Sequence, residues 1–148
     1  DITPQHIVVA SNSLIMDNIQ EALEKMNAAA RDWVCLFWFA GRETFGYDQF
    51  WAPLFDESYI AGPGHIVLLN ILDRMNIHPN VAVSRQTHIQ EYDSLEEATE
   101  YWAGNLQASS SDQYEIIRRR LEKTLIHEGG AFRSRREVRS AMIWWRKD

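Results

Sequence analysis

Two apolar runs decide the fold class of this 148-residue chain: Ile7-Val8-Val9-Ala10 and Trp33-Val34-Cys35-Leu36-Phe37-Trp38-Phe39. The segment between them repeats apolar residues at the 3.6-residue period of an amphipathic helix. A strand, a helix and a second strand in this order predict a β-α-β unit of a parallel sheet that helices cover on both faces. No glycine-rich phosphate loop is found in this unit. In open α/β sheets, ligands bind at the carboxyl ends of the strands, so we expect function near residues 11–13 and 40–42.

The rest of the chain predicts further elements by the same kind of pattern. We expect strands near 6–10, 33–39, 81–91 and 138–145, the third near a sheet edge and the fourth in the sheet interior. We expect helices near 14–30, 48–51, 65–75, 95–105 and 112–126. Three helix starts carry a predicted cap: Asn12 or Ser13, Ser94, and the pattern that opens with Asp112. Gly129-Gly130 is predicted to end the last helix.

The resulting prediction is an α/β fold with about four mixed strands packed with helices. At this length we expect one domain over residues 1–148. Its parts are a β-α-β unit (1–41), an aromatic-rich insertion with a helix (42–80), and closing strands and helices (81–148).

Composition and charge exclude several classes of protein. No apolar stretch approaches the ~20 residues that span a bilayer, and the chain has one cysteine, which excludes a disulfide framework. We therefore expect a cytoplasmic protein with no membrane partner. Residues 118–148 carry 10 basic and 4 acidic side chains, against 5 and 17 before them. This basic region is typical of a solvated helix face or of a patch for an anionic partner.

The chain resembles the C-terminal half of class I S-adenosylmethionine-dependent methyltransferases. Residues 7–14 are similar to the fourth strand and its loop in that family. The segment Asp17-to-Ala30 is similar to the next helix, and Trp33-to-Phe39 is similar to the fifth strand. Val81-to-Tyr92 and Arg139-to-Trp145 resemble the last two strands, the second of which inserts antiparallel between its neighbours. The spacing of Tyr92-Asp93-Ser94-Leu95-Glu96-Glu97-Ala98 before a helix is similar to that of uncharacterised bacterial members.

This resemblance implies a partial Rossmann-like methyltransferase sheet that carries the acceptor side of the site. The glycine-rich loop and the acidic ribose-binding residue of the family are absent from this chain, so we expect S-adenosylmethionine to bind weakly or not at all to it alone. The resemblance carries the loop beside the cofactor's methionine end over to Ala10, Ser11 and Asn12. Because residue 1 is Asp rather than Met, we expect a processed product or an excised domain.

Further candidates for the site follow from the residue types near the second strand's end. Gly41 and Arg42 follow that strand, and Arg42 could bind an anionic acceptor. His65 could act as a base or as a polar pocket group. Aromatic side chains of the insertion could enclose an apolar acceptor or a sulfonium, and those assigned to the substrate are Phe45, Tyr47 and Trp51. Histidine and cysteine spacing predicts no metal site.

Two other functions compete with methyl transfer to an unknown small-molecule acceptor. A sheet that starts at the family's fourth strand would expose an apolar edge, which predicts a non-catalytic interaction module or homo-oligomer formed through the first strand. The basic C-terminal region would suit RNA or another polyanion, although the acidic remainder makes nucleic acid the weaker expectation.

Overall fold

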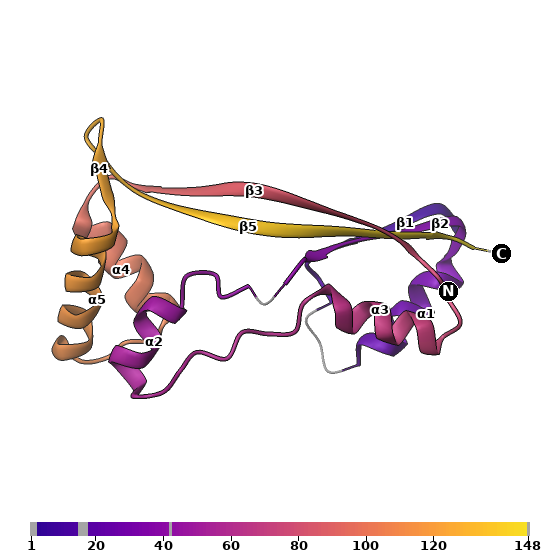
Figure 1. Cartoon of the computed structure of the whole chain (residues 1–148), viewed down its shortest axis with the longest axis horizontal. Helices are drawn as coiled ribbons and strands as arrows, with labels where there is room; N and C mark the ends of the chain where they lie inside the picture. Colours follow the sequence, from indigo (N-terminus) through magenta and orange to yellow (C-terminus); the bar gives the residue numbers. More distant parts are fainter. Residues whose placement is uncertain (1–2, 15–17, 42, 148) are drawn as a thin grey trace. The chain divides into compact units, whose positions relative to one another are not determined.

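The computed structural model describes residues 3–14, 18–41 and 43–147 of the chain. Strands and helices alternate in its first part, as Figure 1 shows. The elements are β1 (Gln5–Ser11), α1 (Ile19–Ala29), β2 (Ala30–Phe39), α2 (Asp48–Phe55), α3 (His65–Arg74), β3 (Asn80–Tyr92), α4 (Leu95–Asn105), α5 (Ser111–Thr124), β4 (Ile126–Glu128) and β5 (Ala131–Arg146). The predicted α/β fold class is therefore confirmed.

The chain packs as two compact units. Unit 1 consists of Asp1–Glu43, Gly62–Gln86 and Val138–Asp148, and unit 2 consists of Thr44–Ala61 and Thr87–Glu137. The long strands β3 and β5 contribute residues to both units, because the boundaries fall within them. The single domain expected over residues 1–148 stays a prediction.

The sheet has the order β1-β2-β5-β3, with β4 paired to β5, among the described residues. β1 and β2 are parallel, with Ser11 opposite Phe37. β5 is antiparallel to β2, with Ser140 opposite Phe39. The parallel β-α-β unit, the edge position of the strand at 81–91 and the interior, antiparallel position of the last strand are all confirmed.

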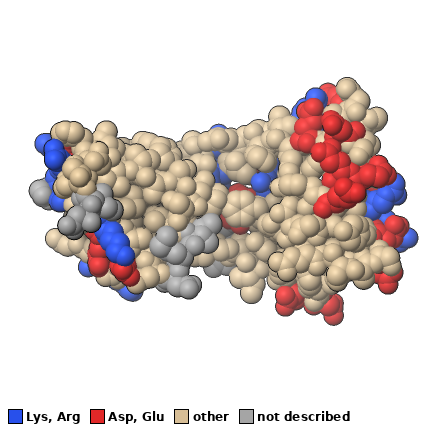
Figure 2. All heavy atoms as spheres, turned by 180° about the vertical axis from the view of Figure 1, so that it is seen from behind, with Lys and Arg blue, Asp and Glu red and all other residues tan. Residues whose placement is uncertain are grey.

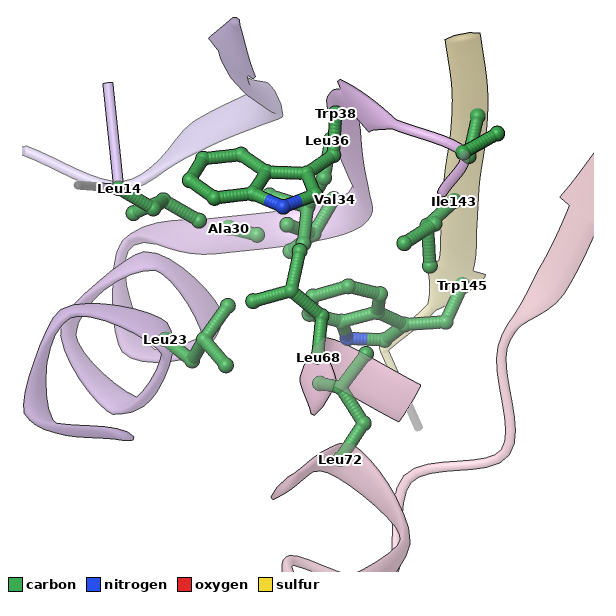
Figure 3. Packing of buried hydrophobic residues seen from close by; sticks show 12 residues of the cluster. Leu14, Leu23, Ala30, Val34, Leu36, Trp38, Leu68, Leu72, Ile143 and Trp145 are labelled. Atoms are coloured by element: carbon green, nitrogen blue, oxygen red, sulfur yellow. The ribbon is translucent and has the colours of Figure 1, made fainter. Parts of the chain in front are cut away.

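The core of unit 1 lies between the sheet and the helices α1 and α3. Alternate residues of β2 point into it, so Val34 and Leu36 are fully buried beside Leu23 of α1 and Leu68 of α3 (Figure 3). Ile143 of β5 is also fully buried in this cluster. Burial of each such side chain is worth about 1.5–3 kcal/mol, which makes this face the main source of stability for the β-α-β unit.

The opposite face of the same strands is apolar and exposed. Ile7 and Val9 of β1 are 56% and 58% exposed, and Trp33 and Phe37 of β2 are 37% and 40% exposed. The prediction of helices on both faces is therefore wrong for the described residues. The reason is that α1 and α3 both pack on the face of the sheet to which Val34 points, while α2, α4 and α5 belong to unit 2.

Unit 2 has its own core, formed by α2, α4 and α5. In α4 the buried side chains recur every three or four residues and form one stripe. This stripe meets Phe50 of α2 and Leu121 of α5. The buried residues of the cluster are Phe50, Tyr92, Leu95, Ala98, Trp102, Ala103, Leu106, Ile117 and Leu121.

Two of the three predicted helix starts need correction. The N-cap of α1 is Asn18, whose side-chain oxygen accepts a hydrogen bond from the Glu21 N–H at 3.3 Å. Asn12 and Ser13 are therefore not the cap, because the chain runs further past β1 before the helix begins; residues 15–17 lie outside the described residues. α5 is capped by Ser110 in a capping box with Gln113, just before the Asp112 pattern. The Ser94 cap of α4 is confirmed.

The Gly129-Gly130 pair forms a hairpin turn between β4 and β5, and the prediction that it ends the last helix is wrong, because α5 ends at Thr124 with Leu125 as its C-cap. Both glycines have positive φ, 63° and 83°, as a two-residue hairpin of this kind requires. β4 was missed, and β5 begins at Ala131 rather than near 138, so the described sheet has five strands instead of about four. The start of β5 is predicted too late because the run of charged side chains between residues 133 and 137 hides the two-residue period of that strand.

Candidate functional site

The carboxyl ends of β1 and β2 lie beside each other in unit 1. Past the end of β1, the Asn12 N–H donates a hydrogen bond to the Phe37 carbonyl at 3.1 Å. Asn12 adopts the left-handed conformation, with φ 49°, and this turns the chain away from the sheet. Ser11 and Asn12 are exposed, whereas Ala10 is partly buried and packs against the core. The predicted cofactor-side residues, Ala10, Ser11 and Asn12, therefore lie at the carboxyl end of β1.

The N-terminus of α3 packs closely against the residues that follow β2. A Cβ placed on Gly64 would lie 2.5 Å from the Gly41 carbonyl oxygen, so only a glycine fits there without a shift of the backbone. Gly64 is the N-cap of α3, and His65 is the first residue of the helix. Unsatisfied N–H groups give this helix end a positive partial charge. Gly41 and His65, two predicted site residues, are thus brought close together through Gly64.

His65 and Arg139 add polar groups to this region. The Nδ1 atom of His65 is buried and has no hydrogen-bond partner among the described residues. Arg139, which the sequence analysis missed as a site residue, places its guanidinium 3.3 Å from where a Cβ of Gly41 would lie. Its carbonyl also accepts a hydrogen bond from the Ala40 N–H at 2.8 Å. Only the antiparallel register of β2 and β5 brings Arg139 here, so no local pattern could have found it.

The predicted aromatic residues belong to unit 2, whereas the residues described above belong to unit 1. Tyr47 stacks on Tyr59 at 5.7 Å between ring centroids, and Trp51 meets Tyr59 edge-on at 5.0 Å. The Trp51 indole N–H donates to the Glu57 carboxylate at 3.1 Å. Phe45 lies under the guanidinium of Arg136. The structure thus divides the predicted substrate residues between the two units, and Arg42 lies outside the described residues.

A cavity of about 610 Å³ opens within unit 2. Its walls include four aromatic side chains and one arginine, namely Phe45, Tyr47, Tyr101, Trp102 and Arg136. Tyr92 is buried close by, against Tyr101, and its hydroxyl has no hydrogen-bond partner among the described residues. Burial raises the pKa of Tyr92 to about 12, so this phenol stays neutral at physiological pH.

Several arginines of the basic C-terminal region pair with carboxylates. Arg119 contacts Glu115 at 2.7 Å, Arg133 contacts Glu91 at 2.7 Å, and a further pair joins Arg135 to Glu128 at 3.2 Å. Acidic and basic atoms accordingly lie side by side over the unit that holds α4 and α5 (Figure 2). These pairs reduce the positive potential that a polyanion would need, although binding of RNA stays a prediction.

The described part of the chain shows neither a metal site nor a helix that could span a membrane. No group of three or more His, Cys, Asp or Glu side chains is placed there to hold a metal ion. None of its helices has both the length and the apolar character needed to cross a membrane.

The residues at the ends of β1 and β2 fit one part of S-adenosylmethionine, the cofactor that the family resemblance implies. A hydroxyl at Ser11, an amide at Asn12 and the N-terminus of α3 are donors that suit a carboxylate. The buried, unpartnered Nδ1 of His65 marks a polar position in the same region. This fit extends to the amino-acid end of the cofactor only.

No protein-family model matches the sequence, and no curated protein matches it. Among the solved structures that resemble the fold are these two. One is a "putative methyltransferase" (BH2331) of Bacillus halodurans C-125, with a TM-score of 0.47 and 12% identity, over 99% of this chain and 65% of that one. The other is the MccD protein, with a TM-score of 0.42 and 13% identity, over 100% of this chain and 63% of that one. The chain spans less than two thirds of the length of either.

Proposed function

We propose that this chain is the acceptor-side portion of an S-adenosylmethionine-dependent methyltransferase that acts on a small molecule. The observation that supports this most is the position of β5, antiparallel between β2 and β3. The sequence resemblance implied this arrangement for the last strand of the sheet. The parallel pair of β1 and β2, with its polar loops at the carboxyl ends, supplies the place where such a sheet binds ligands.

In this proposal the chain contributes binding and orientation. S-adenosylmethionine, when bound, supplies an electrophilic methyl group. Ser11 and Asn12 hydrogen-bond the carboxylate at the cofactor's amino-acid end, and the N-terminus of α3 favours the same negative charge. His65, with its unpartnered Nδ1, accepts a proton from an acceptor that arrives protonated. Alignment of the acceptor with the methyl group provides much of the rate enhancement.

Calorimetric titration with S-adenosylmethionine tests the proposal. This chain should bind weakly or undetectably, whereas a form extended before residue 1 should bind tightly. In the extended form, Asn12→Gly should weaken binding about tenfold, because it removes the amide but keeps the left-handed backbone. Asn76→Gly is the matched control, since Asn76 has the same conformation, φ 57°, at the far end of α3. Tight binding by neither form would contradict the proposal.

A second function, self-association, has a specific observation in its favour. β1 is an edge strand, and the apolar face made by Ile7, Val9, Trp33 and Phe37 is exposed beside it. We propose that a second copy of the chain pairs with the free edge of β1 and covers the adjacent apolar face, because exposed strand edges favour pairing and exposed apolar patches mark interaction surfaces. The chain would then act as an interaction module.

Light scattering over a concentration series tests self-association. The chain should form a dimer, and Val9→Lys should shift it to a monomer because it places a charge on the exposed face. Ile60→Lys is the control, since Ile60 is 85% exposed and belongs to unit 2. A strict monomer at high concentration would show that this function is wrong.

A further inference from the structure

The unit 2 cavity has the size and lining of a small-molecule site. Its volume of about 610 Å³ falls within the range of ligand pockets, roughly 300–1,000 Å³. Aromatic rings form most of its apolar wall, and they already contact one another: Trp102 meets Tyr47 edge-on at 5.5 Å and Tyr101 edge-on at 5.7 Å. Asn105 adds a polar group at the rim. Such walls favour a flat, apolar ligand.

Arg136 gives this aromatic cavity a positive charge that forms no ion pair with a carboxylate of the described residues. Its Nη1 atom is buried and makes no hydrogen bond with the described residues. Its guanidinium carbon lies 5.9 Å from the centre of the Phe45 ring, within the range of a cation–π contact. A guanidinium nitrogen that is withdrawn from water in this way gains more from an anionic partner than an exposed one does.

The geometry of β5 explains why Arg136 has no carboxylate partner in the part of the chain that the structure describes. Successive side chains of a strand point to opposite faces, so Arg133 and Arg135 share one face and Arg136 has the other. Glu91 also lines the cavity, but Arg133 holds its carboxylate at 2.7 Å. Arg135 contacts Glu128. The nearby carboxylates are therefore neutralised by the other two arginines.

The backbone of Phe45 at the cavity wall is strained. Phe45 has a positive φ of 56°, an unusual conformation for a bulky residue, and Gly46 follows with φ 86°. A Cβ on Gly46 would lie 3.2 Å from the Trp102 ring. Strain of this kind clusters at ligand clamps. The strained residue is the one whose ring lies under the Arg136 guanidinium.

We propose that this cavity binds a planar aromatic carboxylate, with one of the perpendicular rings of Tyr47 and Trp102 against its face, the other against its edge, and Arg136 against its carboxylate. This site lies wholly within unit 2 and is independent of the proposed methyl transfer. The planar fork of arginine donors matches a carboxylate in two parallel hydrogen bonds, which a neutral amide cannot reproduce.

Calorimetry with 2-naphthoate, 2-naphthamide and acetate tests the site on the full chain. Naphthoate should bind, naphthamide should bind at least tenfold more weakly, and acetate should not bind in the same concentration range. Equal binding of naphthoate and naphthamide, or no binding of naphthoate at millimolar concentration, would overturn the proposal. This comparison needs no variant, so it decides the question even where a substitution prevents folding.

Variants then assign the charge to Arg136. Arg136→Gln should weaken naphthoate binding at least tenfold, to the level of naphthamide, whereas Arg136→Lys should keep a preference for the carboxylate. Arg135→Gln is the matched control, because it removes one charge from the same strand but not from the cavity wall. Circular dichroism confirms that each variant is folded. Unchanged naphthoate binding in folded Arg136→Gln would refute the assignment.

Discussion

Replacement of Gly64 by alanine tests whether the end of β2 and the start of α3 meet as the structure has them. Gly64 has φ −78° and ψ −171°, a conformation that alanine adopts without strain. The only obstacle is the close approach, in which the new Cβ would lie 2.5 Å from the Gly41 oxygen and 2.8 Å from its carbonyl carbon. Both atoms belong to backbone, so a side-chain rotation cannot relieve the contact.

The expected loss of stability follows from two opposing effects. Overpacking of one methyl group against fixed atoms costs about 1–3 kcal/mol. The lower conformational entropy of alanine in the unfolded chain returns about 0.4–1 kcal/mol. We therefore expect the free energy of unfolding to fall by about 1–2 kcal/mol. With a slope of about 2 kcal/mol per molar urea, the midpoint should fall by roughly 0.5–1 M.

Gly62→Ala is the control for this experiment. Gly62 lies in the same loop, and a Cβ placed there would meet no atom within 4 Å. Its urea midpoint, measured by circular dichroism, should stay unchanged or rise slightly. Equal midpoints for the Gly64 and Gly62 variants would refute the close approach, and with it the juxtaposition of Gly41 and His65 in the candidate site.

Three further predictions concern the two cores and a helix cap. Leu23→Ala, which leaves a cavity at a fully buried position, should lower the free energy of unfolding by about 2–5 kcal/mol, whereas Ile60→Ala at an exposed position should change it little in the same urea titration. Ser110→Ala should cost about 1 kcal/mol by removing the cap of α5, and Ser109→Ala should not, since Ser109 bonds Gln113 through its backbone N–H. The raised pKa of Tyr92, about 12, means that the contribution of its neutral phenol to stability is present below pH 10 and is lost as the pH rises from 10 to 12. The Tyr92→Phe variant should therefore lose less stability between pH 9 and pH 12 in urea titrations, and an identical loss in both proteins would contradict this prediction.

Local patterns predicted most of the elements because each of them has a local cause. The apolar runs at 7–10 and 33–39 became β1 and β2, and the stripe that begins at Leu95 became α4. The Ser94 cap needs only a hydroxyl and an amide three residues apart. β4 was missed because three residues are too few to show a period and depend on pairing with β5.

The candidate site could be predicted only in part. Ser11 and Asn12 follow a strand, and the rule that ligands bind at carboxyl ends of parallel strands locates them from the sequence. Arg139 and Arg136 carry no comparable local signal. Their positions depend on which strand lies beside β5 and on the face to which each side chain points, and a shift of one residue in register would exchange those faces.

The sequence by itself determined the α/β class, the parallel β-α-β unit and the polar loops at its strand ends, since these follow from the periods and caps of neighbouring residues. Only the tertiary structure decided that Gly41 meets Gly64, that the sheet keeps an open apolar face, and that the aromatic residues belong to a second unit with Arg136. These features join residues that lie tens of positions apart in the chain. They arise from the packing of side chains and the pairing of strands, which no local pattern specifies.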